Sequence, residues 1–185
     1  MVRIDRVVTR GGDAGETSLG DGARLGKDTA RIEAIGSVDE ANAALGVLRC
    51  LVAGDAATDA MLSRLQNDLF DVGADIAVPG AAGERLRVTD APVARLEAEI
   101  AAMNSGLAPL TSFVLPGGAP AAAQAHVART LLRRAERRVA VLRAEGINPA
   151  VLRLLNRASD HLFVLSRVLN AGAGGDVLWA PGANR

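Results

Sequence analysis

Apolar side chains recur every three or four residues over most of the chain, which is the spacing of amphipathic helices. In the first such stretch, Ile35, Val38 and Leu45 fall on one side of a helix. The pattern predicts five helices joined by short loops, and an antiparallel bundle is the natural architecture for such a set. The expected helices run from about 28 to 52, from Thr58 to Pro79 and Gly80, from about 90 to 105, from about 120 to 145 and from about 149 to 171.

Capping residues support several of these ends. Asn148 followed by Pro149 is a cap before a proline at the first helical position, which is a strong start signal for the last helix. Thr58 or a neighbouring aspartate is expected to cap the second helix, and either Thr89 or Asp90 the third.

The composition agrees with closely packed helices, because 49% of the residues are apolar but only 2% are aromatic. The length of 185 residues suits one domain, residues 1–185, with an N-terminal segment (1–27), a helical bundle (28–171) and a C-terminal tail (172–185). The single cysteine, Cys50, excludes an intramolecular disulfide and a cysteine-cluster metal site, and we expect it in the core.

Net charge and hydropathy limit which partners and which cellular location the sequence predicts for this protein. The acidic and basic residues number 21 each, which removes any whole-molecule argument for binding nucleic acid or an anionic membrane. No apolar run approaches the roughly 20 residues that span a bilayer, and the start has no apolar stretch of signal-peptide length. We therefore expect a cytoplasmic protein.

Some twenty residues near the start, VVTRGGDAGETSLGDGARLGKD, are too polar to bury a core. They do not form a Walker A loop, because Asp21 stands at the first glycine position and Asp28 follows Lys27 where a hydroxyl is required. The dinucleotide pattern G-x-G-x-x-G is also missing. What remains is either a frayed terminus or a generic anion-binding loop, in which amides and hydroxyls donate while Arg10 and Lys27 neutralise charge.

Basic charge is concentrated in the expected fourth helix. Arg129 and Arg133 are four residues apart and therefore share one face. One interpretation is a solvated face with Glu136 as an ion-pair partner. The other is a face turned inward, whose cations require anionic partners such as Asp39 of the first helix. The five arginines, which fall within the ten residues 129–138, are Arg129, Arg133, Arg134, Arg137 and Arg138.

Five segments together resemble the PduO-type ATP:cob(I)alamin adenosyltransferases, also called corrinoid adenosyltransferases. They occur in the family's order over nearly the whole chain: TRGGDAGETSL, GKDTARIEAIGSVDEANAALG, FVLPGG, AHVARTLLRRAERRV and LNRASDHLFVLSRVLN. The resemblance implies an all-α, five-helix antiparallel bundle with a glycine-rich N-terminal nucleotide-binding segment, assembled as a homotrimer with active sites between subunits. The implied activity transfers the 5′-deoxyadenosyl group of ATP to the cobalt of cob(I)alamin, giving adenosylcobalamin and triphosphate.

The resemblance also implies roles for individual residues. Asp39 and Arg129 match a pair whose salt bridge across the subunit boundary organises the site, and Phe113 matches the aromatic residue that packs under the corrin ring. Arg133 matches a position that serves both catalysis and ATP binding. The sequence departs from the family at Gly11, where threonine is usual, and around Ala14 and Glu16. The implied ATP-binding positions are Thr9, Arg10, Gly11, Gly12, Thr17, Ser18, Lys27, Arg133, Arg134, Glu136, Arg137 and Asn156.

The implied chemistry is an attack by Co(I) on the 5′ carbon of ATP, which leaves negative charge on the departing triphosphate. Arg133, Lys27 and a magnesium ion can stabilise that charge. The magnesium is expected to bind through the ATP phosphates, without direct protein ligands. No proton moves in this step, which fits a chain with only two histidines. Beyond ATP and cob(II)alamin or cob(I)alamin, the implied partners are a flavin-dependent reductase and an enzyme that receives adenosylcobalamin.

Two other classes of protein compete with this interpretation. A non-catalytic, ATP- or polyphosphate-responsive helical regulator would use the same arginines. An RNA-binding module would need aromatic stacking platforms, which three phenylalanines and one tryptophan scarcely provide. We therefore expect no nucleic-acid partner.

Overall fold

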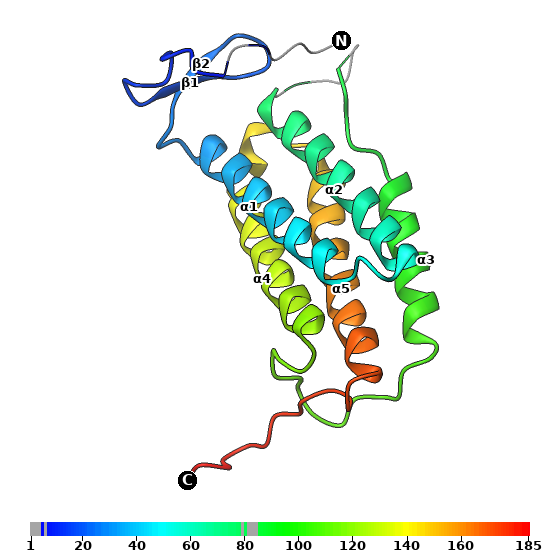
Figure 1. Cartoon of the computed structure of the whole chain (residues 1–185). Coiled ribbons are helices and arrows are strands. Elements are labelled where there is room, and N and C mark those ends of the chain that lie inside the picture. Colours follow the sequence, from blue (N-terminus) through cyan, green and yellow to red (C-terminus); the bar gives the residue numbers. More distant parts are fainter. Residues whose placement is uncertain (1–4, 6, 79, 81–84) are drawn as a thin grey trace.

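The computed structural model describes residue 5, residues 7–78, residue 80 and residues 85–185. Within these residues the chain forms a short β-hairpin followed by five α-helices (Figure 1). The hairpin pairs β1 (Glu16–Ser18) with β2 (Arg24–Gly26) in antiparallel register. The helices are α1 (Ala30–Leu51), α2 (Ala56–Ala77), α3 (Ala91–Asn104), α4 (Pro120–Val141) and α5 (Pro149–Ala171), with a 3₁₀ turn, η1, over Leu142–Glu145.

Successive helices run in opposite directions, so the predicted five-helix antiparallel bundle is confirmed (Figure 1). α1 lies against α2 and α4, and α5 lies against α4 and α3. The hairpin extends from the end of the bundle where α1 begins, whereas the C-terminal tail leaves from the opposite end. The bundle therefore separates the N-terminal segment from the tail by the length of its helices.

Small side chains build the part of the core between α1 and α4. Ala34 and Ala41 of α1 and Ala125, Ala128 and Ala135 of α4 are all 0% exposed. Alanines at such positions let helix backbones approach closely, which explains how a chain with 2% aromatic residues reaches a dense interior. The outer faces carry charge, and no helix in the described part of the chain is long and apolar enough to cross a membrane. The cytoplasmic location stays a prediction.

The aspartate alternative is the correct one for the cap of α2, which begins before Thr58, whereas α3 begins where predicted but lacks the expected capping bond. α2 begins at Ala56 because the Asp55 carboxylate caps it, accepting hydrogen bonds from the amides of Ala57 and Thr58 at 3.1 Å each. Thr58 therefore lies inside the first turn. Asp90 stands at the N-cap of α3 without capping it, and its carboxylate pairs instead with Arg153 of α5 at 2.7 Å.

The helix ends and Cys50 also need correction. α4 ends at Val141, and the residues expected to extend it form η1, which stops at Gly146 in a left-handed conformation (φ 77°). The expected stop at Pro79 lies outside the described residues. Cys50 is exposed, not buried. It lies two residues beyond the buried Leu48, and that step turns it about 200° around the helix, away from the core.

The segment before α4 is anchored by the buried side chain of Asn170 at the end of α5. Its amide oxygen accepts from the Ala119 amide at 2.9 Å, and its amide nitrogen donates to the Gly117 carbonyl at 3.1 Å. Gly118 has φ 94°, and a Cβ atom there would collide with the Asn170 amide. The glycine is therefore required both by its backbone conformation and by this close approach.

We expect Gly118→Ala to destabilise the protein by about 2 kcal/mol or more, since it adds strain and displaces Asn170. For a chain of this size that corresponds to a fall in Tm of roughly 4–8 °C. Thermal unfolding followed by circular dichroism measures it. Gly117→Ala is the matched control, because a Cβ there meets nothing within 4 Å. Equal Tm values for the two variants would contradict the requirement for glycine at position 118.

Candidate active site

Two basic side chains hold the N-terminal segment in an ordered shape. The Arg24 guanidinium bonds the Glu16 carboxylate at 3.1 Å, the Ser18 hydroxyl at 3.3 Å and the Gly11 carbonyl at 2.9 Å. The Lys27 ammonium donates to the Gly12 carbonyl at 2.9 Å. Residues 7–27 are called the leader below. A polar segment that is ordered by internal hydrogen bonds is better prepared to bind an anion than a frayed end.

Of the seven implied ATP-binding positions of this segment, two lie on β1, four lie in the residues before β1, and Lys27 directly follows β2. A Cβ atom at Gly12 would stand 2.9 Å from the Lys27 ammonium nitrogen, so the glycine lets the lysine approach the backbone. At Gly11 a Cβ would meet only the Thr9 hydroxyl, at 3.7 Å. The family's threonine would therefore fit here, and crowding does not explain its replacement. The seven positions are Thr9, Arg10, Gly11, Gly12, Thr17, Ser18 and Lys27.

The arginines of α4 divide into two groups. Arg134 pairs with Glu40 and Arg138 pairs with Glu33 at 3.1 Å, both carboxylates being on α1. Arg133 and Arg137 are exposed, and Arg137 donates to the Arg133 backbone carbonyl at 3.1 Å. Among the described residues, the Arg133 guanidinium has no carboxylate within ion-pair distance. The solvated-face interpretation therefore suits Arg138, whereas Arg133 is left available to an anion.

Glu136 and Asn156 come together although they are on different helices. The Asn156 amide nitrogen of α5 donates to the Glu136 carboxylate of α4 at 3.0 Å, and both residues are partly buried. The sequence placed both at the nucleotide site only through the family resemblance. Their contact links α4 and α5 on the side of the bundle where the free arginines lie.

Arg129, one turn before Arg133 on α4, and Phe113 line one pocket of about 580 Å³. Phe113 is 76% exposed, so its ring is available to a ligand. The pKa of Arg129 is lowered by burial and by the nearby Arg133, and its Nε is buried without a hydrogen-bond partner. A half-buried cation without a carboxylate partner is costly, which makes this pocket receptive to an anionic group. The remaining lining residues are Leu110, Ser112, Val114 and Phe163.

His126 lies one turn before Arg129 on α4 and is almost completely buried. Burial lowers its pKa, the charge of Arg129 lowers it further, and Asp176 acts in the opposite direction. Its ring centroid lies 6.4 Å from that of Phe163 in an edge-to-face arrangement. A neutral, enclosed imidazole fits a structural role beside the pocket rather than proton transfer.

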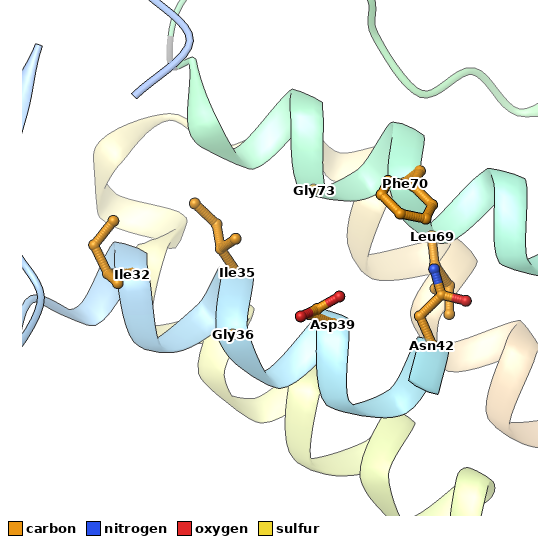
Figure 2. Close-up of a pocket in the computed structure, with 8 residues that line it drawn as sticks. All are labelled: Ile32, Ile35, Gly36, Asp39, Asn42, Leu69, Phe70 and Gly73. Carbon is orange, nitrogen blue, oxygen red and sulfur yellow. The ribbon is translucent and has the colours of Figure 1, made fainter. Parts of the chain in front are cut away.

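Asp39 lines a separate pocket of about 350 Å³ between α1 and α2. In Figure 2 its carboxylate projects into the space between the two helices, with Ile35 beside it and Phe70 on the facing helix. Phe70 is 71% exposed, so the pocket presents an apolar surface around one carboxylate. Asp39 and Arg129, both described, form no ion pair with each other in this chain, and each lines a different pocket. The other lining residues are Ile32, Gly36, Asn42, Leu69 and Gly73.

Sequence reasoning missed Trp179 and Arg24. Trp179 in the tail donates its amide to the Phe113 carbonyl at 2.8 Å, and its ring centroid lies 6.0 Å from that of Phe113. The only signal for it was its being the sole tryptophan of an aromatic-poor chain. Arg24 could have been singled out as the third basic residue of a leader already suspected of binding phosphate.

Metal ligands are not gathered anywhere in the described residues. No three His, Cys, Asp or Glu side chains lie close enough there to hold a metal ion.

Known proteins that match this chain include cobalamin and corrinoid adenosyltransferases. The family model for cobalamin adenosyltransferase matches residues 7–169. A cobalamin adenosyltransferase of Cupriavidus metallidurans is 50% identical over 182 residues, covering 96% of this chain and 95% of the relative. The corrinoid adenosyltransferase of Bacillus subtilis is 40% identical over 177 residues, covering 93% of this chain and 91% of the relative.

The fold comparison agrees. A variant of the PduO-type ATP:corrinoid adenosyltransferase of Lactobacillus reuteri, solved in complex with cobalamin and ATP, matches with a TM-score of 0.89 and 32% identity, over 95% of this chain and 97% of that one. Fold and site thus define a helical-bundle transferase of the corrinoid-modifying class. The chain belongs to the cobalamin adenosyltransferase family.

Proposed function

We propose that this protein transfers the 5′-deoxyadenosyl group of ATP to the cobalt of cob(I)alamin. Membership of the adenosyltransferase family supports this activity. The observation that carries it is the arrangement on α4: Arg129 lines the Phe113 pocket, and the exposed Arg133 lies one turn further along. Four residues of helix rise about 6 Å, so a bound triphosphate and a corrin ring can lie next to each other.

The reaction requires charge stabilisation rather than proton transfer. The electron pair of Co(I) forms the bond to the 5′ carbon of ATP, and the bond from that carbon to oxygen breaks, with its electrons leaving on triphosphate. Arg133 and Lys27 bind the triphosphate and stabilise the charge that develops on it. Magnesium, held through the phosphates, neutralises part of the same charge when bound. Thr17, Ser18 and the amides of Gly11 and Gly12 donate hydrogen bonds to the phosphates.

Phe113 contacts the corrin ring in the proposed site. An apolar ring beneath the macrocycle excludes a lower axial ligand, which leaves cobalt four-coordinate and easier to reduce from Co(II) to Co(I). The 76% exposed ring and the apolar walls of the 580 Å³ pocket support this role. The single electron needed for the reduction comes from a partner, for which a flavin-dependent reductase is suited, and an adenosylcobalamin-dependent enzyme receives the product.

The site is completed by a neighbouring subunit of a homotrimer. Among the described residues no carboxylate pairs with Arg129, whose Nε is buried without a hydrogen-bond partner, and Asp39 lies in an apolar pocket with an exposed Phe70. A salt bridge from Asp39 of one protomer to Arg129 of the next would satisfy both charges and cover Phe70. Such an interface joins two different surface patches. Copies of the chain related in this way form a closed ring of three when each is rotated by one third of a turn relative to the last.

Asp39→Asn tests this interface. The neutral amide cannot compensate the Arg129 charge, so we expect weaker trimer association and turnover reduced by about tenfold or more. Sedimentation velocity over a range of protein concentrations measures the first, and an adenosylation assay the second. Asp71→Asn is the matched control, because it also removes one exposed carboxylate, which lies on α2 instead of α1. A fully active, trimeric Asp39→Asn protein would show that the pairing is dispensable.

The activity itself is tested by mixing the protein with ATP, magnesium and chemically reduced cobalamin and following the corrin absorption spectrum. Conversion to adenosylcobalamin supports the enzyme. Binding of ATP without alkylation of cobalt supports the alternative, a non-catalytic helical protein that responds to ATP or polyphosphate. A four-coordinate Co(II) signature that appears only with ATP bound would connect the nucleotide and corrin parts of the site.

A further inference from the structure

A chain of side-chain hydrogen bonds crosses the bundle through residues of α3, α5 and α4. The Arg157 guanidinium of α5 donates from Nε to the Glu97 carboxylate of α3 at 2.9 Å. Its Nη1 donates to the amide oxygen of Asn156 at 3.0 Å and to the Asp160 carboxylate at 3.1 Å. Asn156 in turn donates to Glu136 of α4 at 3.0 Å. α5 runs between α3 and α4 in Figure 1, so the chain connects three helices in order.

The chemistry of the two neighbours fixes the orientation of the Asn156 amide. Arginine only donates, so the group facing Arg157 must be the amide oxygen. An ionised glutamate only accepts, so the group facing Glu136 must be the amide nitrogen. With both ends held, the amide cannot rotate by half a turn, and it presents one free N–H and one free oxygen lone pair to a ligand.

We infer that Arg157 is a positioning residue, which holds the Asn156 amide in the orientation that binds the nucleotide. This inference rests on the proposed function, in which Asn156 contacts ATP. Arg157 is well placed for the role because Glu97 and Asp160 hold its guanidinium from two sides, so that it forms a fixed support rather than a mobile side chain. Without it, Asn156 keeps only the Glu136 bond and can swing about that contact.

Arg157→Ala should therefore raise the KM for ATP by about fivefold to tenfold and leave kcat within about twofold, since the loss concerns binding of the ground state. Isothermal titration with Mg-ATP should show the same change in Kd. A purely structural role would lower Tm and the fraction of active protein without changing KM. Arg157→Lys serves if the alanine variant folds poorly, because a single ammonium nitrogen lacks the planar fork with which Nε and Nη1 reach Glu97 and Asn156 separately, and it should raise KM at least about threefold.

Arg153→Ala is the matched control. Arg153 lies one turn earlier on α5 and also pairs with a carboxylate at the start of α3, Asp90, at 2.7 Å, but it makes no hydrogen bond to Asn156. It should leave the KM for ATP unchanged. If Arg153→Ala and Arg157→Ala raise KM equally, the effect comes from the α3–α5 contact in general, and the inference is overturned.

A double-mutant cycle separates the inference from the proposed function. In an Asn156→Ala background, Arg157→Ala should have no further effect on KM, because the group it positions is already gone. Additive effects of the two substitutions overturn the positioning role and leave the function standing. A wild-type protein that binds no Mg-ATP overturns both, whereas an Asn156→Ala protein with unchanged KM removes Asn156, and with it Arg157, from the site.

Discussion

Replacing Arg133 by alanine is expected to lower kcat by on the order of a hundredfold. The guanidinium is exposed, has no carboxylate within ion-pair distance among the described residues, and lies one turn from Arg129 in the Phe113 pocket. Its interaction with the triphosphate strengthens as the bond to the 5′ carbon breaks, so its loss affects the transition state more than the bound substrate. Single-turnover measurements with preformed cob(I)alamin isolate this step from cobalt reduction.

The matched control for Arg133 is Arg138→Ala on the same helix. Arg138 pairs with Glu33 on the surface, where both side chains are about half exposed, so its loss removes a positive charge but no contact to the nucleotide. We expect its kcat to stay close to that of the wild type. Unaltered turnover in Arg133→Ala, or an equal loss in Arg138→Ala, would remove Arg133 from its assigned role.

Replacing Phe113 by alanine should nearly abolish formation of Co(I) from Co(II) while leaving the affinity for ATP nearly intact. In the proposed site the Phe113 ring is an apolar wall that keeps a lower axial ligand away from cobalt. Without the ring, water or the nucleotide base of cobalamin can bind cobalt from below, which makes reduction of Co(II) to Co(I) harder. Electron paramagnetic resonance of cob(II)alamin with ATP bound shows directly whether a four-coordinate species forms. With chemically prepared cob(I)alamin the variant should regain much of its rate, since the reduction step is bypassed.

Leu115→Ala is the control for Phe113. Leu115 is in the same segment and is 42% exposed, but it does not line the Phe113 pocket. It should form four-coordinate Co(II) as the wild type does. Equal loss of ATP affinity and of Co(I) formation in Phe113→Ala would indicate a general folding defect instead of a role in the electronics of cobalt.

The helices could be predicted from sequence because their signal is local. Leu45 and Leu48 recur at helical spacing, and the cap at Asn148 accepts from the Ala150 amide at 3.0 Å as expected. The hairpin could not be predicted, because its three-residue strands are too short for alternation to appear and are held by Arg24 across the turn. Cys50 could not be predicted from residue type alone. Cysteine is usually buried, but the position of Cys50 on α1 turns its side chain to the exposed side of the helix.

The candidate site was predictable mainly through family resemblance. Spacing alone placed Arg129 and Arg133 on one face of α4, but it could not tell Arg133 from Arg134, whose partner Glu40 comes from another helix. The contact of Asn156 with Glu136 likewise depends on how α4 and α5 pack. Asp39 and Arg129 needed the structure to show that neither satisfies the other within one chain.

The spacing of arginines along α4 also sets a length scale for the substrate. Positions 129, 133 and 137 succeed one another every four residues, or about 6 Å along the helix. We therefore expect an anion long enough to contact all three positions to bind more tightly than a shorter one, so ATP should bind more tightly than ADP.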